Sequence, residues 1–271
     1  MRVEAERHFV EHMVWDEVAR HLARGAAAIL PIGAGAKQHG LHLPLDTDRV
    51  QAEFLASKLA ARIDALVWPT LSYGHYPAFA DYAGSISLSA ATFEAAVAEI
   101  ASGILSHGCR ALFVLDTGIS TREAAGRALA RIEAGNALHL RIHEGPRYRR
   151  AASGLARQGH GSHADELETS LMLAISPAVV EMSRAEASPP IAQPVPGRLT
   201  PSDRTSPNYS RSGSFGDPTL ATLEKGEALL AAMLDDLGEQ ATTFLAGPTV
   251  TKGLRLRYMA SAQRGKYWQY Q

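Results

Sequence analysis

Hydrophobic residues along the chain follow two patterns that alternate. Short uninterrupted apolar runs are typical of strands covered on both faces, and they span residues 27–32, 65–69, 111–115 and 137–142. Elsewhere apolar residues recur every three or four positions, which predicts amphipathic helices at about 13–24, 48–62, 89–106, 121–135, 166–175 and 218–243. This order of elements predicts an α/β fold, a mostly parallel sheet with helices on both faces.

Two longer stretches lack such periodicity. Residues 145–165 hold basic residues, glycines and two histidines, and residues 185–218 are dense in proline, serine and glycine. Loops of this length in a compact domain are usually functional or disordered. Pro218 is expected in the first turn of the last helix, where its missing N–H is tolerated. No stretch has the composition of a linker, so residues 1–271 are interpreted as one domain.

Composition excludes several classes of protein. Lys and Arg number 27 against 28 Asp and Glu, so no net field would attract nucleic acid or an anionic membrane. No run of about 18 apolar residues and no signal-peptide core is present. The single cysteine, Cys109, agrees with a reducing compartment. We therefore expect a cytoplasmic protein without nucleic acid or membrane partners, whose basic and aromatic tail (251–271) forms a surface or subunit contact.

Candidate chemistry is concentrated directly after the first strand. Glycines and a proline exclude a helix there, and the resulting loop brings His39 close to Asp48 at the start of the next helix. Ligands bind at this end of open α/β sheets, and imidazole with carboxylate suits zinc, manganese or iron. Alternatively, Asp48 caps the helix and His39 hydrogen-bonds within the loop. A second cluster of histidines and carboxylates, residues 160–168, favours the metal interpretation.

Two other enzyme classes fit poorly. The glycines of GAGAK, residues 33–37, match neither the dinucleotide-binding nor the phosphate-loop spacing. A serine hydrolase elbow, G-x-S-x-G, is not present.

The stretch PIGAGAKQHGLHLPLDTD, residues 31–48, resembles the signature of the creatininase (creatinine amidohydrolase) family, roughly P-x-G-x-x-E-Q-H-G-x-H-L-P-x-x-T-D. The likeness continues through GSISLSAATF, HADELETSLMLAISP and FGDPTLATLEKG, and covers about residues 27–235. It implies a parallel α/β fold, a homo-oligomer (in the family usually a hexamer) and hydrolysis of small cyclic or linear amides at a two-metal centre.

The resemblance also assigns roles to individual residues. His39 and Asp48 match family metal ligands, Asp48 at the bridging position, and Glu168 matches a glutamate that faces the centre. His163 matches a histidine thought to donate a proton to the leaving group. The chain departs from the pattern where Lys37 replaces a liganding glutamate and Gly118 a metal-binding histidine.

These departures lead to a hypothesis about charge. The ammonium of Lys37, salt-bridged to Asp48 or Asp116, would occupy the space of one missing metal, because a buried ammonium needs a partner. One divalent metal would remain on His39, Asp48 and Glu168 and activate water for hydrolysis of an amide or cyclic amide C–N bond. His163 would then carry the proton.

Two alternatives stay open at this point. The chain could be a degenerate binding or assembly subunit that holds no metal, or a metal-independent enzyme in which Lys37 acts as base or Schiff-base nucleophile. The loop at 202–217 is expected to lie over the site. Expected substrate-binding residues, some of them on this loop, are His75, Asp116, Arg204, Tyr209 and Arg211.

Overall fold

The sheet has four parallel strands in the order β2-β1-β3-β4. The computed structural model describes residues 7–132, 135–188 and 197–247, and the strands are Ala27–Ile32 (β1), Ala65–Val67 (β2), Leu112–Asp116 (β3) and Ala137–Arg141 (β4). The α/β fold predicted from the sequence is therefore confirmed. Strand β2 is shorter than expected, since Pro31 of β1 has no N–H to donate to β2 beyond the hydrogen bond from Trp68 to Ile29.

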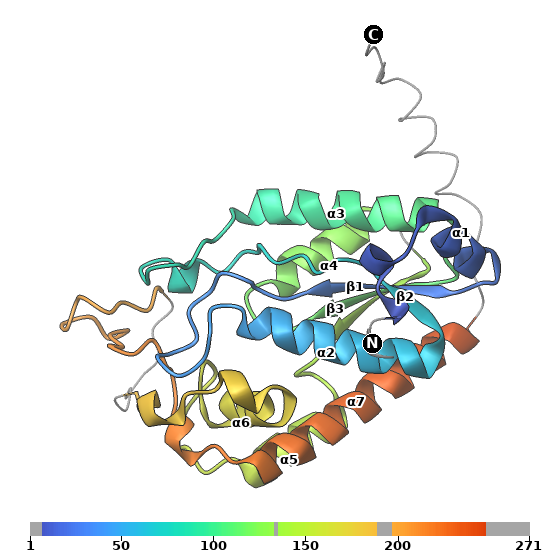
Figure 1. Ribbon diagram of the computed structural model, residues 1–271. Coiled ribbons are helices and arrows are strands. Elements are labelled where there is room, and N and C mark those ends of the chain that lie inside the picture. The colour runs from blue at the N-terminus through green and yellow to red at the C-terminus, as the bar shows by residue number, and fades with distance from the viewer. Residues whose placement is uncertain (1–6, 133–134, 189–196, 248–271) are drawn as a thin grey trace.

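Helices cover both faces of the sheet. Figure 1 shows α3 and α4 on one face and α2 and α7 on the other, with α5 and α6 packed beside α7. The α-helices are Trp15–Ala23 (α1), Thr47–Ile63 (α2), Ala90–Ser106 (α3), Arg122–Arg131 (α4), Pro146–Leu155 (α5), Glu166–Ile175 (α6) and Leu223–Ala246 (α7). Short 3-10 helices are Val10–His12 (η2), Pro77–Phe79 (η3), Pro177–Val179 (η4), Met182–Arg184 (η5) and Pro218–Leu220 (η6).

Strand β1 explains why the strand sequences show no polar side. Ala27 and Ile29 pack into the hydrophobic cluster under α2 and α7. Ala28, Leu30 and Ile32 pack into the cluster under α3 and α4. Because successive side chains of a strand point to opposite faces, a strand covered on both faces must be apolar throughout.

All four strands are parallel, but the connections that leave the two central strands, β1 and β3, run in opposite directions across the sheet. From β1 the chain crosses one face through α2 to reach β2, and from β3 it crosses the other face through α4 to reach β4. The segments that follow β1 and β3, residues 33–46 and 117–121, therefore leave the sheet in opposite directions. Ligand sites of open α/β sheets lie in the crevice that such a reversal creates.

Helix α5 was not predicted from the sequence. Tyr148, Ala151, Ala152 and Leu155 have helical spacing and pack on the core, but two of the four are small. The N-terminus of α5 is capped from α7, since the Asp236 carboxylate accepts the backbone N–H of Tyr148 at 2.8 Å. That cap lies 88 residues away in sequence, so Pro146 in the first turn is left as the local signal for the start of the helix.

The start of the last helix was predicted wrongly. Pro218 opens the short helix η6, and α7 begins only at Leu223. The N-cap is Thr222, whose side chain accepts the backbone N–H of Lys225 at 3.3 Å. A threonine at this position supplies the hydrogen bond that a proline in the first turn cannot.

Helix α7 crosses α6 so closely that only glycine fits at the contact. A Cβ atom at Gly226 would lie 1.9 Å from the backbone oxygen of Ser170. We expect Gly226→Ala to lower the free energy of unfolding by about 2 kcal/mol or more, because the helices must move apart. Urea denaturation measures this.

A matched control is available in α5. A Cβ at Gly154 would meet nothing within 4 Å, so Gly154→Ala should leave stability unchanged or raise it by about 0.5–1 kcal/mol. Equal stabilities for the two variants would contradict the close helix contact.

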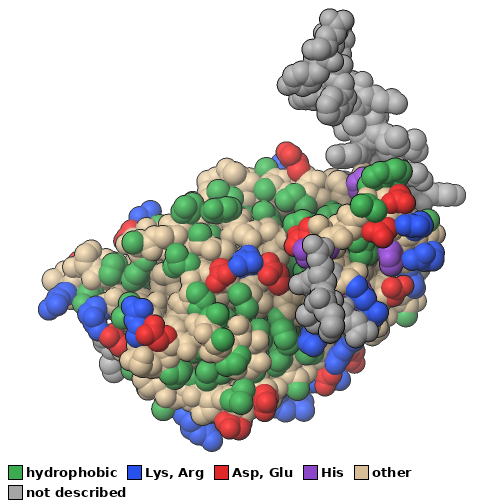
Figure 2. Space-filling model, in the orientation of Figure 1, with side chains coloured by type: hydrophobic (Ala, Val, Ile, Leu, Met, Phe, Trp, Pro, Cys, Tyr) green, Lys and Arg blue, Asp and Glu red, His purple; other side chains and the backbone are tan. Residues whose placement is uncertain are grey.

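The surface agrees with the absence of strong net charge. Acidic and basic side chains are interspersed on the face shown in Figure 2. Among the described helices, none has the length and apolar character needed to cross a membrane. The tail at 251–271, predicted to be a surface or subunit-contact segment, lies outside the described residues.

Candidate functional site

The loop after β1 turns back so that its polar residues face the start of α2. Gly33 makes this turn fit, because a Cβ atom there would lie 2.4 Å from the backbone oxygen of Asp48. Asp48 stands in the first turn of α2, and its side chain is only 5% exposed. The close approach brings Asp48 against the two loop residues Lys37 and His39.

Lys37 forms a buried ion pair with Asp48. Its Nζ lies 2.7 Å from Asp48 Oδ2, with side chains 8% and 5% exposed, and 5.0 Å from the centre of the Phe79 ring. The predicted salt bridge to Asp48 is confirmed. Burial alone would raise the pKa of Asp48, but the nearby Lys37 and His39 outweigh it and hold that pKa below its usual value. The carboxylate therefore stays charged.

Two histidine rings are oriented by backbone carbonyl groups. Nδ1 of His39 donates to the Lys37 carbonyl oxygen at 2.8 Å, and Nε2 of His163 donates to the Gln38 carbonyl oxygen at 2.8 Å. The opposite nitrogens both face Glu168, at 3.7 Å from His39 Nε2 and 3.7 Å from His163 Nδ1. Metal-binding histidines in proteins are typically held this way, with one nitrogen on a fixed acceptor, but Nε2 of His39 also lies within hydrogen-bond distance of Asp48 Oδ1, at 3.1 Å.

Burial controls the protonation of the groups around Glu168. Desolvation, reinforced by Lys37 and His39, holds the pKa of His163 well below its usual value, so its ring is neutral. Desolvation raises the pKa of Glu168, and the charge of His39 only partly opposes it. A buried carboxyl whose charged form is disfavoured gains most from a cation beside it.

Three ligand atoms are close enough to reach one divalent ion. His39, His163 and Glu168 each offer one atom, and these atoms lie within 4.8 Å of one another. Ligand atoms around a tetrahedral zinc ion lie about 3.4 Å apart, whereas the 3.7 Å distances run to Oε1 of Glu168 from His39 and to Oε2 from His163, so an ion would draw these groups closer together. The set predicted from the sequence contained Asp48 in place of His163. In Asp48, Oδ2 instead forms the ion pair with Lys37, and Oδ1 lies 3.1 Å from His39 Nε2.

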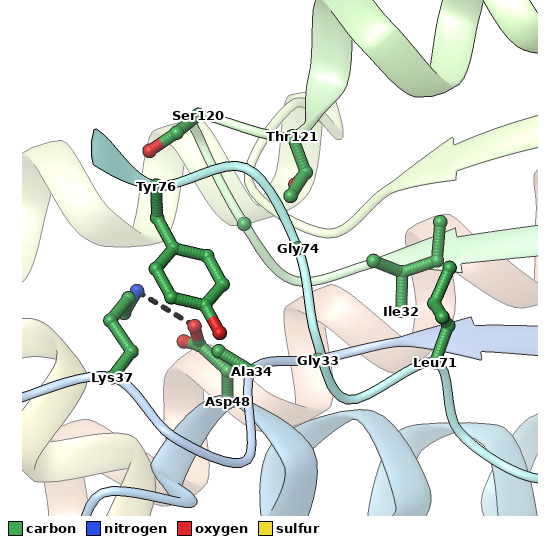
Figure 3. Close-up of a pocket in the computed structure, with 11 residues that line it drawn as sticks. Ile32, Gly33, Ala34, Lys37, Asp48, Leu71, Gly74, Tyr76, Ser120 and Thr121 are labelled. Carbon is green, nitrogen blue, oxygen red and sulfur yellow. Dashed lines mark ion pairs between the residues drawn. The ribbon is translucent and has the colours of Figure 1, made fainter. Parts of the chain in front are cut away.

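Beside the ion pair lies a narrow pocket, whose centre has room for about one water-sized group. Figure 3 shows Lys37 and Asp48 joined across it, with the Tyr76 ring alongside. Its other walls come from the end of β1, the segment at 71–74 and the turn before α4. The full lining is Ile32, Gly33, Ala34, Lys37, Asp48, Leu71, Gly74, Tyr76, Gly118, Ser120 and Thr121.

The predicted substrate-binding residues do not line this pocket. Nδ1 of His75 donates to the Leu88 carbonyl oxygen at 2.9 Å, and the neighbouring Tyr76 lines the pocket instead. Arg204 is exposed, and Arg211 forms an ion pair with Glu186. Tyr209 is half-buried, and its backbone N–H donates to the Ser206 carbonyl oxygen at 3.1 Å. Their roles in substrate binding stay predictions.

Asp116, predicted as the alternative partner of Lys37, instead forms hydrogen bonds within the loop after β3. Its carboxylate accepts hydrogen bonds from the Thr121 hydroxyl at 2.6 Å and the Gly118 backbone N–H at 3.0 Å. The other oxygen lies 3.1 Å from Nε2 of His139. Asp116 thus fixes the turn that forms one wall of the pocket.

The loop at 202–217 does reach the site through its last residues. The Gln38 side chain donates to the Gly213 carbonyl oxygen at 2.9 Å, and the backbone of Phe215 pairs with that of His163. Sequence reasoning missed two residues of the site, Tyr76 and Phe79. The aromatic content of YGHYPAF, residues 73–79, is the sequence signal that could have identified them.

Comparison with known proteins agrees with this fold. The family model Creatininase, described as creatinine amidohydrolase, matches residues 11–241. A mycofactocin precursor peptide peptidase of Mycobacterium ulcerans is 31% identical over 233 residues, covering 81% of this chain and 86% of that protein. A creatinine amidohydrolase of Pseudomonas putida is 27% identical over 256 residues, covering 85% and 95%.

Solved creatininase structures share the architecture. A crystal structure of creatinine amidohydrolase superposes with a TM-score of 0.74 and 25% identity, covering 89% of this chain and 99% of that one. A creatininase in a manganese form has a TM-score of 0.73, with the same identity and coverage. Since the family model spans most of the chain and the relatives align over most of their length, the protein belongs to the creatininase family.

Proposed function

We propose that the protein hydrolyses a C–N bond of an amide or cyclic amide with one divalent ion, zinc, manganese or iron, held by His39, His163 and Glu168. The observation that carries this proposal is the pair of imidazole nitrogens aimed at the half-buried Glu168 carboxylate, each ring fixed by a backbone carbonyl. A neutral His39 ring has only a lone pair at Nε2. The carboxylate oxygens facing it are repulsive unless a proton or a metal ion lies between them.

A bound divalent ion would supply Lewis acidity and lower the pKa of a bound water. The chain's own residues orient the ligand side chains and neutralise charge around them. The Nε2–H of His163 donates a hydrogen bond to the Gln38 carbonyl oxygen. This supports a role as metal ligand rather than the proton-donor role predicted from the sequence. Asp48 holds Lys37 on one side and His39 on the other, and so links the ammonium to the metal-binding residues.

Lys37 supplies a fixed positive charge in this proposal. Its ion pair with Asp48 stabilises the ammonium, which is not a nucleophile, and this argues against the Schiff-base alternative. The ammonium stands in the position where the family signature has a metal-binding glutamate. One charge of the two-metal centre would thus be retained without its ion.

The names of the relatives indicate the substrate class. One group is named for peptidase action on the mycofactocin precursor peptide and another for hydrolysis of creatinine, and both reactions break a C–N bond. We therefore propose a small amide, cyclic amide or peptide as substrate. A cytoplasmic location and a homo-oligomer, a hexamer by resemblance, stay predictions.

The test combines metal analysis with product detection. Protein stripped with chelator is reloaded with zinc, manganese or iron, and mass spectrometry follows creatinine and the mycofactocin precursor peptide. We expect about one metal equivalent per chain and cleavage of one of these substrates. Protein that binds no metal and cleaves neither would instead support the binding or assembly subunit, which the departures from the family signature at Lys37 and Gly118 favour.

A further inference from the structure

One buried hydroxyl of the pocket has no hydrogen-bond partner. The Tyr76 oxygen makes no hydrogen bond to any described residue, although the side chain lines the pocket and the residue is only 3% exposed. Figure 3 shows the ring beside the Lys37–Asp48 pair. Buried hydroxyls in proteins are nearly always paired, because an unpaired one loses its bonds to water. In the described residues this hydroxyl has no partner, so only a group that enters the pocket, a water or a ligand, can pair it.

The position of Tyr76 is fixed from outside the pocket. Its backbone N–H donates to the Ser87 hydroxyl at 3.0 Å, and it precedes the short helix η3. A Cβ atom at Gly74 would lie 3.2 Å from the Tyr76 ring, so the backbone packs closely on that side. The hydroxyl is thus held in place before any ligand arrives.

A second donor lines the same pocket. An ammonium has three N–H groups. In Lys37 one is directed at Asp48, and the Phe79 ring covers another side of the nitrogen. The pocket that Tyr76 and Lys37 share is narrow, with room at its centre for about one water-sized group. These dimensions fit a single oxygen atom better than a whole carboxylate.

We propose that this pocket receives the carbonyl oxygen of the scissile amide, with Tyr76 donating a hydrogen bond to it and Lys37 stabilising its negative charge. The proposal rests on the proposed hydrolysis and names a catalytic residue for it. Water adds through its oxygen to the carbonyl carbon, and the π electron pair moves onto the oxygen held by Tyr76. The C–N bond then breaks, and a proton from the water ends on the leaving nitrogen.

The hydroxyl keeps its own proton throughout. Burial raises the pKa of Tyr76 to about 12; the Gly74 backbone, close to the hydroxyl but outside hydrogen-bonding geometry, opposes this in part, and Asp48 adds to it. The phenol therefore acts as a donor at neutral pH and not as an acid. Donors placed where charge develops stabilise the transition state more than the ground state.

The kinetic test is Tyr76→Phe, measured on whichever of creatinine or the mycofactocin precursor peptide the wild type cleaves. We expect kcat to fall by about 100-fold and KM to change by less than about threefold, with the same metal content. The melting temperature should stay equal or rise, because the variant loses only a hydroxyl that has no partner. The matched control is Tyr73→Phe, a half-exposed tyrosine on the same segment, which should leave kcat unchanged.

Two results would overturn the proposal. One is an unchanged kcat in Tyr76→Phe. The other is a lower melting temperature with equal losses in kcat and metal content, which would make the hydroxyl structural.

A binding measurement separates this proposal from the proposed function. If the wild type binds no metal and cleaves neither substrate, hydrolysis is refuted, and titration calorimetry with inorganic phosphate, a tetrahedral oxyanion that can enter the pocket with one of its oxygens, decides about the pocket. Affinity at least about tenfold weaker in Tyr76→Phe than in Tyr73→Phe would support an oxygen-binding pocket. Equal affinities, or no phosphate binding by the wild type, would refute it.

Discussion

Replacing Lys37 by methionine is expected to lower the free energy of unfolding by about 3–5 kcal/mol in metal-free protein. The substitution keeps the length and apolar stem of the side chain but leaves the Asp48 carboxylate, 5% exposed, without its ammonium. His39 remains in contact at 3.1 Å and compensates only in part. Urea denaturation in the presence of a chelator measures the loss.

A double-mutant cycle isolates the pair itself. Asp48→Asn alone leaves the ammonium unpaired, whereas Lys37→Met with Asp48→Asn removes both charges. The double variant should therefore be more stable than the sum of the two single losses predicts. Strictly additive losses would show that the pair contributes no coupling.

A surface lysine on α2, the helix that carries Asp48, provides the control. Lys58 is exposed on α2, so Lys58→Met should change stability by no more than about 0.5 kcal/mol. A Lys37→Met variant as stable as this control would mean that the ammonium does not compensate Asp48, and the charge-replacement hypothesis would fail.

The second large effect is expected at Glu168. Glu168→Gln keeps the shape of the side chain and its bond to the Ala164 backbone N–H, but removes the charge that a divalent ion needs. We expect metal affinity and hydrolysis to fall by at least about 100-fold, because the only carboxylate of the proposed ligand set is lost. Metal analysis after dialysis against a fixed metal concentration gives the affinity.

Stability should move in the opposite direction from metal binding. Burial raises the pKa of Glu168, so the neutral glutamine should be tolerated at least as well as the carboxylate in metal-free protein. Glu99→Gln, at an exposed position on α3, is the matched control and should change neither property. Unchanged metal content in Glu168→Gln would place the ion elsewhere or exclude it.

The fold could be predicted largely because its signals are local. The apolar run of β1 and the periodic helix α3, capped by Ser89, each report their own burial without reference to the rest of the chain. Helix α5 is the exception. Half of its apolar side is alanine and its cap comes from Asp236 on α7, so part of the information lies in another helix.

The residues of the site likewise divide into those that local sequence brings together and those that only distant contacts bring together. The sequence by itself determined the family, the parallel α/β order and the meeting of Lys37, His39 and Asp48, since a short loop and the first turn of α2 keep these three together. Only the tertiary structure decided that His163 faces the same carboxylate as His39, because Nε2 of its ring is held by the carbonyl of Gln38, 125 residues away.

Side-chain direction was equally beyond the reach of the sequence. Tyr76 enters the pocket while its neighbour His75 turns to the Leu88 carbonyl, and Arg211 pairs with Glu186 outside the pocket. Spacing along a loop fixes which residues are near one another but not which way each points. That choice depends on packing and hydrogen bonds supplied by distant segments, which exist only once the chain has closed on itself.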